Sequence, residues 1–195
     1  TIVFFMSDNG GAAYSYGGAD NAPLRGGKSE TYEGGIRVVS LLRWPGRVEA
    51  GSRFESIMTV MDLFPTLAEA AGVKLGNQKP MDGGSLWQPI VQNKPAPRDE
   101  WVFFTSETPI YGEFNIAAFN DQWKLVQRIE QNQLQTDVTN YLFDIKKDPY
   151  EYHNLAEQYP QVVAEIAAAV VDWRAQYPIN GTRSKLAPPP GAAAA

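Results

Sequence analysis

The chain contains no cysteine and a single histidine, His153. It can therefore form neither a disulfide nor a thiolate metal site, and it has no cysteine nucleophile. One imidazole also excludes a zinc site built from several histidines. No apolar run reaches the roughly 18 residues that a membrane-spanning helix needs. Disulfide-stabilised, multi-histidine zinc and membrane-inserted classes are thus excluded.

The charge balance is acidic, with 17 Lys and Arg against 22 Asp and Glu and a formal net charge of -5. Such an excess of negative charge disfavours nucleic acid or an anionic membrane surface as a partner. Hydrophobic residues make up 44% of the 195 residues, enough for one sizeable core or one core with a small satellite.

Two apolar segments in the first half predict strands. Residues 1–6 and Ile36–Leu42 are rich in β-branched and large apolar side chains, which is typical of strands buried on both faces of a parallel sheet. The glycine-rich segment 7–35 between them is long for a plain connection, and long ordered loops are often functional. We expect an α/β fold with part of a mostly parallel sheet.

A helix is predicted next, followed by a linker. Asp62 is suited to cap the helix N-terminus, and Gly72 to end it in the left-handed conformation. One face of this helix carries the apolar residues Leu63, Phe64, Leu67, Ala68 and Ala71. Residues 74–100 are rich in Pro, Gly, Asn and Lys, and predict a linker over the surface.

The second half predicts a small α+β subdomain. Apolar residues at steps of three and four from about Pro160 predict an amphipathic helix. We expect one unit over residues 1–100, a second over 101–177 and a disordered tail over 178–195. Four short strand candidates separated by turn residues predict a four-stranded antiparallel sheet: Trp101–Thr105, Phe114–Phe119, Gln122–Arg128 and Asn140–Ile145.

Polar residues follow the first predicted strand, at the sheet edge where ligands bind in open α/β folds. The carboxylate of Asp8 and the amide carbonyl of Asn9 are hard oxygen ligands, suited to Ca²⁺ or Mg²⁺. An Asx turn that ends the strand explains the same residues without a ligand. Residues Ser7–Gly11 alone leave both interpretations open, and the turn is the commoner one.

Basic residues lie further along the same loop. Arg25 and Lys28 flank two glycines, an arrangement suited to holding an anion with help from backbone N–H groups. Ordinary solvated side chains are the alternative interpretation. The segment is not a phosphate-binding P-loop, because position 22 is Ala where that motif requires its first glycine.

Taken in order, these motifs resemble the arylsulfatase family of the alkaline-phosphatase-like superfamily, from about residue 2 to residue 175. The resemblance implies that residues 1–100 are the C-terminal part of the catalytic α/β domain and residues 101–177 the family's C-terminal subdomain. The matching segments are Asp8–Gly11, Asn21–Lys28, Tyr32–Arg37, Arg43–Gly46, Val60–Leu67 with Ala71-Gly72, Asp82-Gly83 with Ser85-Leu86, Trp123–Leu125 and Leu142–Ala156.

The resemblance also implies roles. Asp8 and Asn9 match the pair that coordinates the active-site calcium, and Lys28 matches the lysine that contacts the substrate's sulfate. The implied activity is hydrolysis of a sulfate ester by a formylglycine hydrate, with sulfated small molecules or sulfated glycans as substrates, in a family that is mostly periplasmic or secreted. The other charged residues of the motif block are expected to support or pack: Arg25, Glu33 and Arg37.

One departure from the family is decisive. Formylglycine arises from a Cys or Ser in a Cys/Ser-x-Pro-x-Arg motif, and no serine here has Pro and Arg at those offsets. Two ligands also fall short of the six to eight oxygens that Ca²⁺ takes. We therefore expect a piece of a longer sulfatase that is inactive alone and whose exposed sheet edge favours self-association.

Two other functions stay open. A phosphodiesterase or phosphonate hydrolase would share the superfamily fold, and a non-catalytic binding domain would keep the scaffold without the reaction. A Ser-His-Asp hydrolase is disfavoured because no Gly-x-Ser-x-Gly elbow is present, so His153 is expected to be a surface or capping residue.

Overall fold

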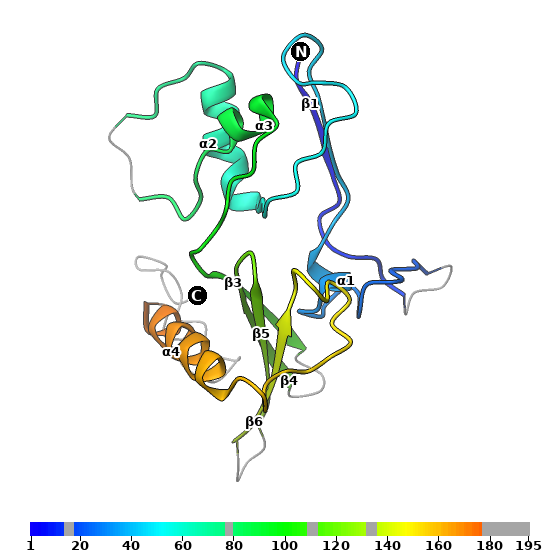
Figure 1. Ribbon diagram of the computed structural model, residues 1–195, viewed down its shortest axis with the longest axis vertical. Coiled ribbons are helices and arrows are strands. Elements are labelled where there is room, and N and C mark those ends of the chain that lie inside the picture. The colour runs from blue at the N-terminus through cyan, green and yellow to red at the C-terminus, as the bar shows by residue number, and fades with distance from the viewer. Residues whose placement is uncertain (14–17, 77–79, 109–112, 132–135, 177–195) are drawn as a thin grey trace, which may run out of the picture.

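The computed structural model describes residues 1–13, 18–76, 80–108, 113–131 and 136–176. Its elements form two groups, with a short helix lying between them (Figure 1). One group holds β1, β2, α2 and α3, and the other holds β3 to β6 and α4. The elements are β1 (Val3–Met6), α1 (Glu33–Ile36), β2 (Ser40–Arg43), α2 (Val60–Ala70), α3 (Trp87–Gln92), β3 (Val102–Thr108), β4 (Glu113–Phe119), β5 (Trp123–Gln131), β6 (Thr136–Asp144) and α4 (Pro160–Gln176).

The first two strands pair with each other in antiparallel register. Alternate strand residues point to opposite faces, and Val3, Phe5 and Leu41 share a face that is between 51% and 62% exposed. The expectation that both strands are buried on both faces is therefore wrong for the described chain. The second strand also starts later than predicted, at Ser40, because residues 33–36 form α1.

Helix α2 begins one turn earlier than the sequence indicated. Thr59 occupies the cap position, and its backbone N–H donates to the carboxylate of Asp62 at 2.7 Å, forming a capping box. Gly72 follows the helix with φ of +72°, as predicted. The buried side of α2 includes Asp62 and Thr66, whereas Phe64 is 60% exposed and Leu67 37% exposed, so part of the apolar face of the helix lies at the surface of this chain.

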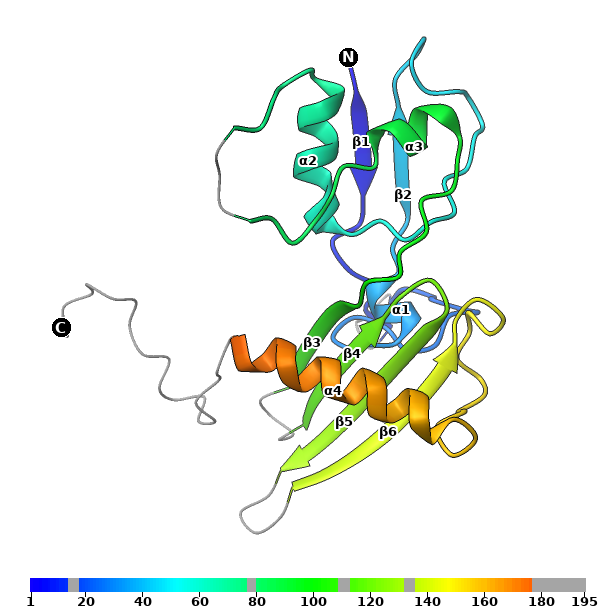
Figure 2. The same cartoon turned by 60° about the vertical axis from the view of Figure 1, so that its left-hand side comes forward.

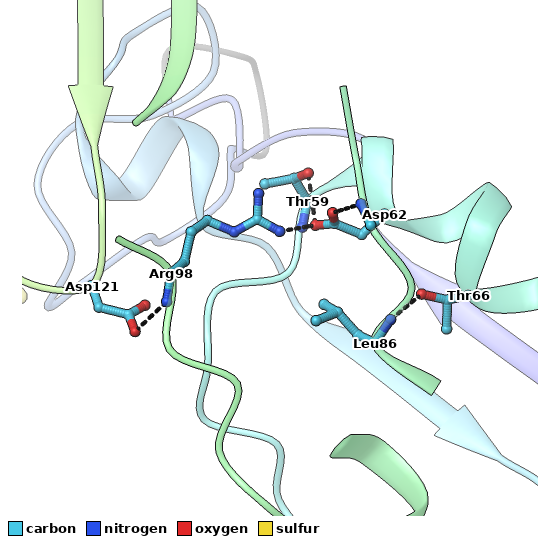
Figure 3. Close-up of polar contacts among 7 residues, drawn as sticks. Thr59, Asp62, Thr66, Leu86, Arg98 and Asp121 are labelled. Carbon is cyan, nitrogen blue, oxygen red and sulfur yellow. Dashed lines mark hydrogen bonds and ion pairs between the residues drawn. The ribbon is translucent and has the colours of Figure 1, made fainter. Parts of the chain in front are cut away.

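The segment predicted as a surface linker is instead packed against α2 (Figure 3). It contains α3, and Leu86 and Trp87 are buried. The Leu86 N–H donates to the Thr66 hydroxyl at 2.9 Å. Arg98 donates to Asp62 at 2.8 Å through its guanidinium and to Asp121 at 2.8 Å through its backbone N–H. These bonds fasten the segment at its middle and near its C-terminal end.

The second group is the predicted meander, with strand order β3-β4-β5-β6 and antiparallel pairing throughout. Figure 2 shows α4 lying across one face of this sheet. Leu125, Leu142, Ile166 and Val170 form the core between them. On the opposite face, Tyr32, which directly precedes α1, packs against Val126 and Phe143. The sheet thus has a helix on one face and the candidate site loop on the other.

None of the helices within the described ranges is long and apolar enough to cross a membrane. The predicted tail over 178–195 lies outside those ranges, and the division of the chain near residue 100 stays a prediction.

The Asp62 carboxylate is expected to stabilise the fold while it is ionised. Burial raises its pKa, but hydrogen bonds from Arg98, Thr59 and Gly84 outweigh that effect and hold the pKa below its usual value. Asp62→Asn should therefore lower the free energy of unfolding by about 1–3 kcal/mol at pH 7. This loss should shrink as the pH falls through the folded-state pKa, because the carboxylate is then protonated in both states of the wild type.

Urea unfolding at pH 7 and pH 3 measures both effects. Asp82→Asn is the matched control, because Asp82 is exposed. Equal stabilities of Asp62→Asn and Asp82→Asn at pH 7 would contradict the role of the carboxylate.

Candidate functional site

The two predicted metal ligands lie in a tight turn directly after β1. The Ser7 hydroxyl donates to the Asn9 carbonyl oxygen at 2.7 Å, and the Gly10 N–H donates to the Gly35 carbonyl oxygen at 2.8 Å. Asp8 is exposed and Asn9 half-buried. A backbone hydrogen bond thus ties this turn to α1, and both candidate ligands have access to solvent.

The turn is joined to the loop that carries Lys28. The Lys28 N–H donates to the Gly11 carbonyl oxygen at 3.0 Å. The Asn21 side chain makes a two-way bridge to the Gly11 backbone at 2.8 Å in each direction, and also donates to the Gly26 carbonyl oxygen at 3.2 Å. The backbones that carry Asp8, Asn9 and Lys28 are therefore held together, and convergence of the three side chains stays a prediction.

Glycine is required where these segments cross. A Cβ atom added to Gly10 would collide with the carbonyl oxygen of Gly34, and one added to Gly34 would collide with the carbonyl oxygens of Arg25 and Gly26. These contacts are between backbones that cannot swing aside, so side chains at either position would force the loops apart. The glycine-rich composition of the loop follows from this close backbone packing.

A buried lysine fixes the loop on the second group. Lys124 of β5 is fully buried, and its Nζ lies 2.9 Å from the Glu33 Oε1 and 2.9 Å from the Glu151 Oε1. The Glu33 N–H also donates to the second Glu151 oxygen at 2.7 Å. The three groups come from α1, from a strand and from the turn after β6, so this ion network connects three distant segments.

The network places two carboxylates against one ammonium. Burial raises the pKa of Glu151, and the neighbouring charge of Lys124 acts in the opposite direction. Arg25 adds positive charge nearby, because its guanidinium lies 4.0 Å from the centre of the Tyr32 ring and donates to the Glu151 carbonyl oxygen at 3.2 Å. The positive charge of Arg25 thereby offsets part of the excess negative charge of the Glu33 and Glu151 carboxylates.

Two members of the motif block have the supporting roles that the sequence indicated. Glu33 and Arg25 hold the loop, whereas Arg37 is exposed and lies 3.7 Å from the Glu33 carboxylate. Lys124 and Glu151 were not among the functional residues predicted from the sequence. A signal was present for the lysine, since it stands between apolar residues at an inward position of a predicted strand.

The oxygen donors of Asp8 and Asn9 are too few for a complete calcium site. Within the described ranges, no three His, Cys, Asp or Glu residues form a group that could hold a metal ion. Asp8 and Asn9 offer one carboxylate and one amide carbonyl, the donor types that Ca²⁺ prefers, but fewer than the six to eight that it takes. The pair therefore fits as part of a calcium site completed by other residues.

His153 has the surface role expected for it. Its side chain is 77% exposed. The His153 backbone N–H donates to the Asp148 carboxylate at 2.9 Å, and its Nδ1 lies 3.3 Å from the same oxygen. The histidine thus closes a surface turn.

Removing the buried ammonium should destabilise the protein strongly. Lys124→Met keeps the length of the side chain but leaves the buried carboxylates of Glu33 and Glu151 without the ammonium that they share, a loss that typically costs about 3–5 kcal/mol. Urea unfolding measures the loss, and hydrogen exchange at residues 26–36 should show it locally. Lys146→Met is the control because Lys146 is exposed. Matching stabilities for the two variants would refute the linking role of Lys124.

Comparisons with known proteins agree with these features. The model of the family described as N-sulphoglucosamine sulphohydrolase, C-terminal, matches residues 27–176. Arylsulfatase A from Bos taurus is 32% identical over 188 residues, covering 87% of this chain and 36% of that protein. Steryl-sulfatase from Rattus norvegicus is 37% identical over 109 residues, covering 53% of this chain and 19% of that protein. The chain therefore spans about a third or less of the length of these relatives.

The fold is also found in solved structures. The crystal structure of Ps i-CgsB superposes with a TM-score of 0.73 and 32% identity, covering 88% of this chain and 36% of that one. Four antiparallel strands with α4 agree with the expected C-terminal subdomain of an alkaline-phosphatase-like fold. Because the family model matches residues 27–176, more than half of the sequence, and the arylsulfatase A match covers 87% of the chain at 32% identity, the chain belongs to the sulfatase family, as a C-terminal sulfatase domain.

Proposed function

We propose that this chain is the C-terminal part of a calcium-dependent sulfatase that hydrolyses sulfate esters. The observation that carries the proposal is the junction at Gly11, where the turn bearing Asp8 and Asn9 meets the loop bearing Lys28. Membership of the sulfatase family makes a sulfuric ester hydrolase the first choice among enzymes with such a site.

Each residue has a distinct task in the proposed site. Asp8 and Asn9 contribute two oxygen ligands to the calcium ion, which supplies positive charge to the sulfate oxygens. Lys28 donates a charge-assisted hydrogen bond to one of those oxygens and offsets the negative charge that develops as the ester bond breaks. The formylglycine nucleophile is expected outside this chain, which alone is proposed to be inactive.

The exposed apolar surface supports the proposal that further chain completes the protein. Val3, Phe5 and Leu41 on the strands, and Phe64 on α2, are each more than half exposed. Surfaces of this kind mark interaction sites in soluble proteins. We propose that the rest of the protein covers them, and that the isolated chain self-associates through them.

A sulfated glycan is the proposed substrate class. Ps i-CgsB has been solved in complex with k-i-k-neocarrahexaose. N-acetylgalactosamine-6-sulfatase from Homo sapiens, 40% identical over 96 residues, covers 48% of this chain and 18% of that protein. Both names point to saccharides, and we extend that substrate class to the protein that contains this chain.

Lys28→Ala in the full-length protein should lower kcat for an aryl sulfate about 10²–10³-fold, because the variant loses a donor to the charged oxygens of the transition state. The exposed Lys146→Ala is the control, and circular dichroism should show an unchanged fold. Equal turnover of the two variants would contradict the role of Lys28. Faster hydrolysis of an aryl phosphate ester would favour a phosphodiesterase or phosphonate hydrolase, and no turnover of either ester by the wild type would favour a binding domain.

Asp8→Ala should weaken calcium binding by the full-length protein about 10- to 100-fold or more, because a direct ligand is lost. Isothermal titration with CaCl₂ measures the affinity without relying on turnover. Asp82→Ala is the control, since Asp82 is exposed and lies in a different loop. Calcium affinity that is the same in both variants would remove Asp8 from the site.

A further inference from the structure

A small cleft lies between part of the site loop and the C-terminal sheet. It has a volume of about 60 Å³ and is lined by Glu30, Thr31, Tyr32, Asn115 and Arg128. A single water needs roughly 10–15 Å³ by the same kind of measure, so the cleft admits several oxygen-sized groups but not a large molecule. The loop side of the cleft is anchored, because the Ser106 hydroxyl of β3 donates to the Ser29 carbonyl oxygen.

One hydroxyl in the cleft wall has no partner within the described protein. Thr31 is only 1% exposed, and its Oγ1 makes no hydrogen bond there. A buried polar group left in this condition costs about 1–3 kcal/mol. It is therefore a ready partner for an oxygen or N–H group that enters the cleft.

The other lining groups mix donors with acceptors. The Asn115 amide and the Thr31 hydroxyl both donate and accept, the Arg128 guanidinium only donates, and the Glu30 carboxylate only accepts. Both charged side chains of the lining already have one partner each. Glu30 accepts a hydrogen bond from the Gly27 N–H at 2.8 Å, and the Arg128 Nε lies 3.0 Å from the Glu130 carboxylate.

This mixture favours neutral hydroxyl groups over a second anion. The Glu30 carboxylate repels an anion, whereas a hydroxyl can donate to it and accept from Arg128 or Asn115. Tyr32 also lines the cleft, but its ring already packs against Arg25 and Phe143, so the polar groups carry the selectivity.

We propose that this cleft binds hydroxyl groups of a neighbouring sugar unit of the substrate. The assignment rests on the proposed function, because Lys28 is taken to hold the sulfate. Thr31 is three residues from Lys28, and three residues span at most about 11 Å. A saccharide held by its sulfate at Lys28 can therefore extend along the loop towards the cleft.

Nuclear magnetic resonance titration of the full-length protein, with its formylglycine precursor residue replaced by alanine so that the probes are not hydrolysed, tests the assignment. The probes are galactobiose carrying a 6-O-sulfate, galactose 6-sulfate and sodium sulfate. The sulfated disaccharide should shift the amide signals of Thr31 and Asn115 and bind more tightly than the sulfated monosaccharide. Thr31→Val should weaken disaccharide binding about three- to tenfold, as the loss of one hydrogen bond predicts, and should leave monosaccharide binding unchanged.

Two further variants keep the result interpretable. Thr105→Val removes a threonine hydroxyl from β3, where residue 105 alternates with Ser106 and so faces the other side of the sheet. This variant should bind both saccharides as the wild type does. Asn115→Asp keeps the side-chain shape but loses the N–H donor, and should weaken disaccharide binding even if Thr31→Val does not fold.

The outcomes separate the two proposals. Shifts at Lys28 with sodium sulfate or galactose 6-sulfate, but none at Thr31 and Asn115 with the disaccharide, would overturn the cleft and leave the sulfate site intact. Shifts at the cleft with the disaccharide and none at Lys28 with any probe would support the cleft and count against the sulfate site. Sodium sulfate alone shifting the cleft signals, or no saccharide shifting them, would overturn the assignment.

Discussion

The candidate site depends on one buried charge. The ammonium of Lys124 has no access to solvent, and a charge in that position is tolerated only when opposite charges surround it. Glu33 and Glu151 provide those charges from segments 91 and 27 residues away along the chain. The loop before α1, the strand β5 and the turn after β6 must therefore meet as the protein folds. The position of the Lys28 loop is a consequence of that meeting.

The two groups of elements satisfy different physical demands. Both faces of the C-terminal sheet are covered: α4 packs on one face, and Tyr32 with the site loop packs on the other. The first group leaves apolar strand and helix faces open to solvent, and an ion pair from Asp62 to Arg98 links α2 to the segment that leads into β3. The residues of the proposed site lie between the two groups, and Lys124 and Glu151 of the C-terminal group hold the loop that carries Lys28.

Local sequence was a good guide where a pattern is repeated over several residues. The meander and α4 were predicted because their apolar residues recur at the spacing of strands and of a helix. Helix α3 was missed because six residues between Pro- and Gly-rich segments carry too little periodic signal. The start of α2 was misplaced because Thr59 and Asp62 are both good capping residues, and only their reciprocal bonding decides which one is the cap.

The sequence by itself determined the chemistry available at the site: the oxygen ligands of Asp8 and Asn9, the ammonium of Lys28, and enough ordered motifs to indicate the sulfatase family. Only the tertiary structure decided that Lys124 and Glu151 hold this loop, that β1 and β2 pair antiparallel, and that Thr31 faces a cleft. The reason is physical. Residue type follows from the sequence position alone, whereas a buried ion network and a cleft arise between segments that no local pattern connects.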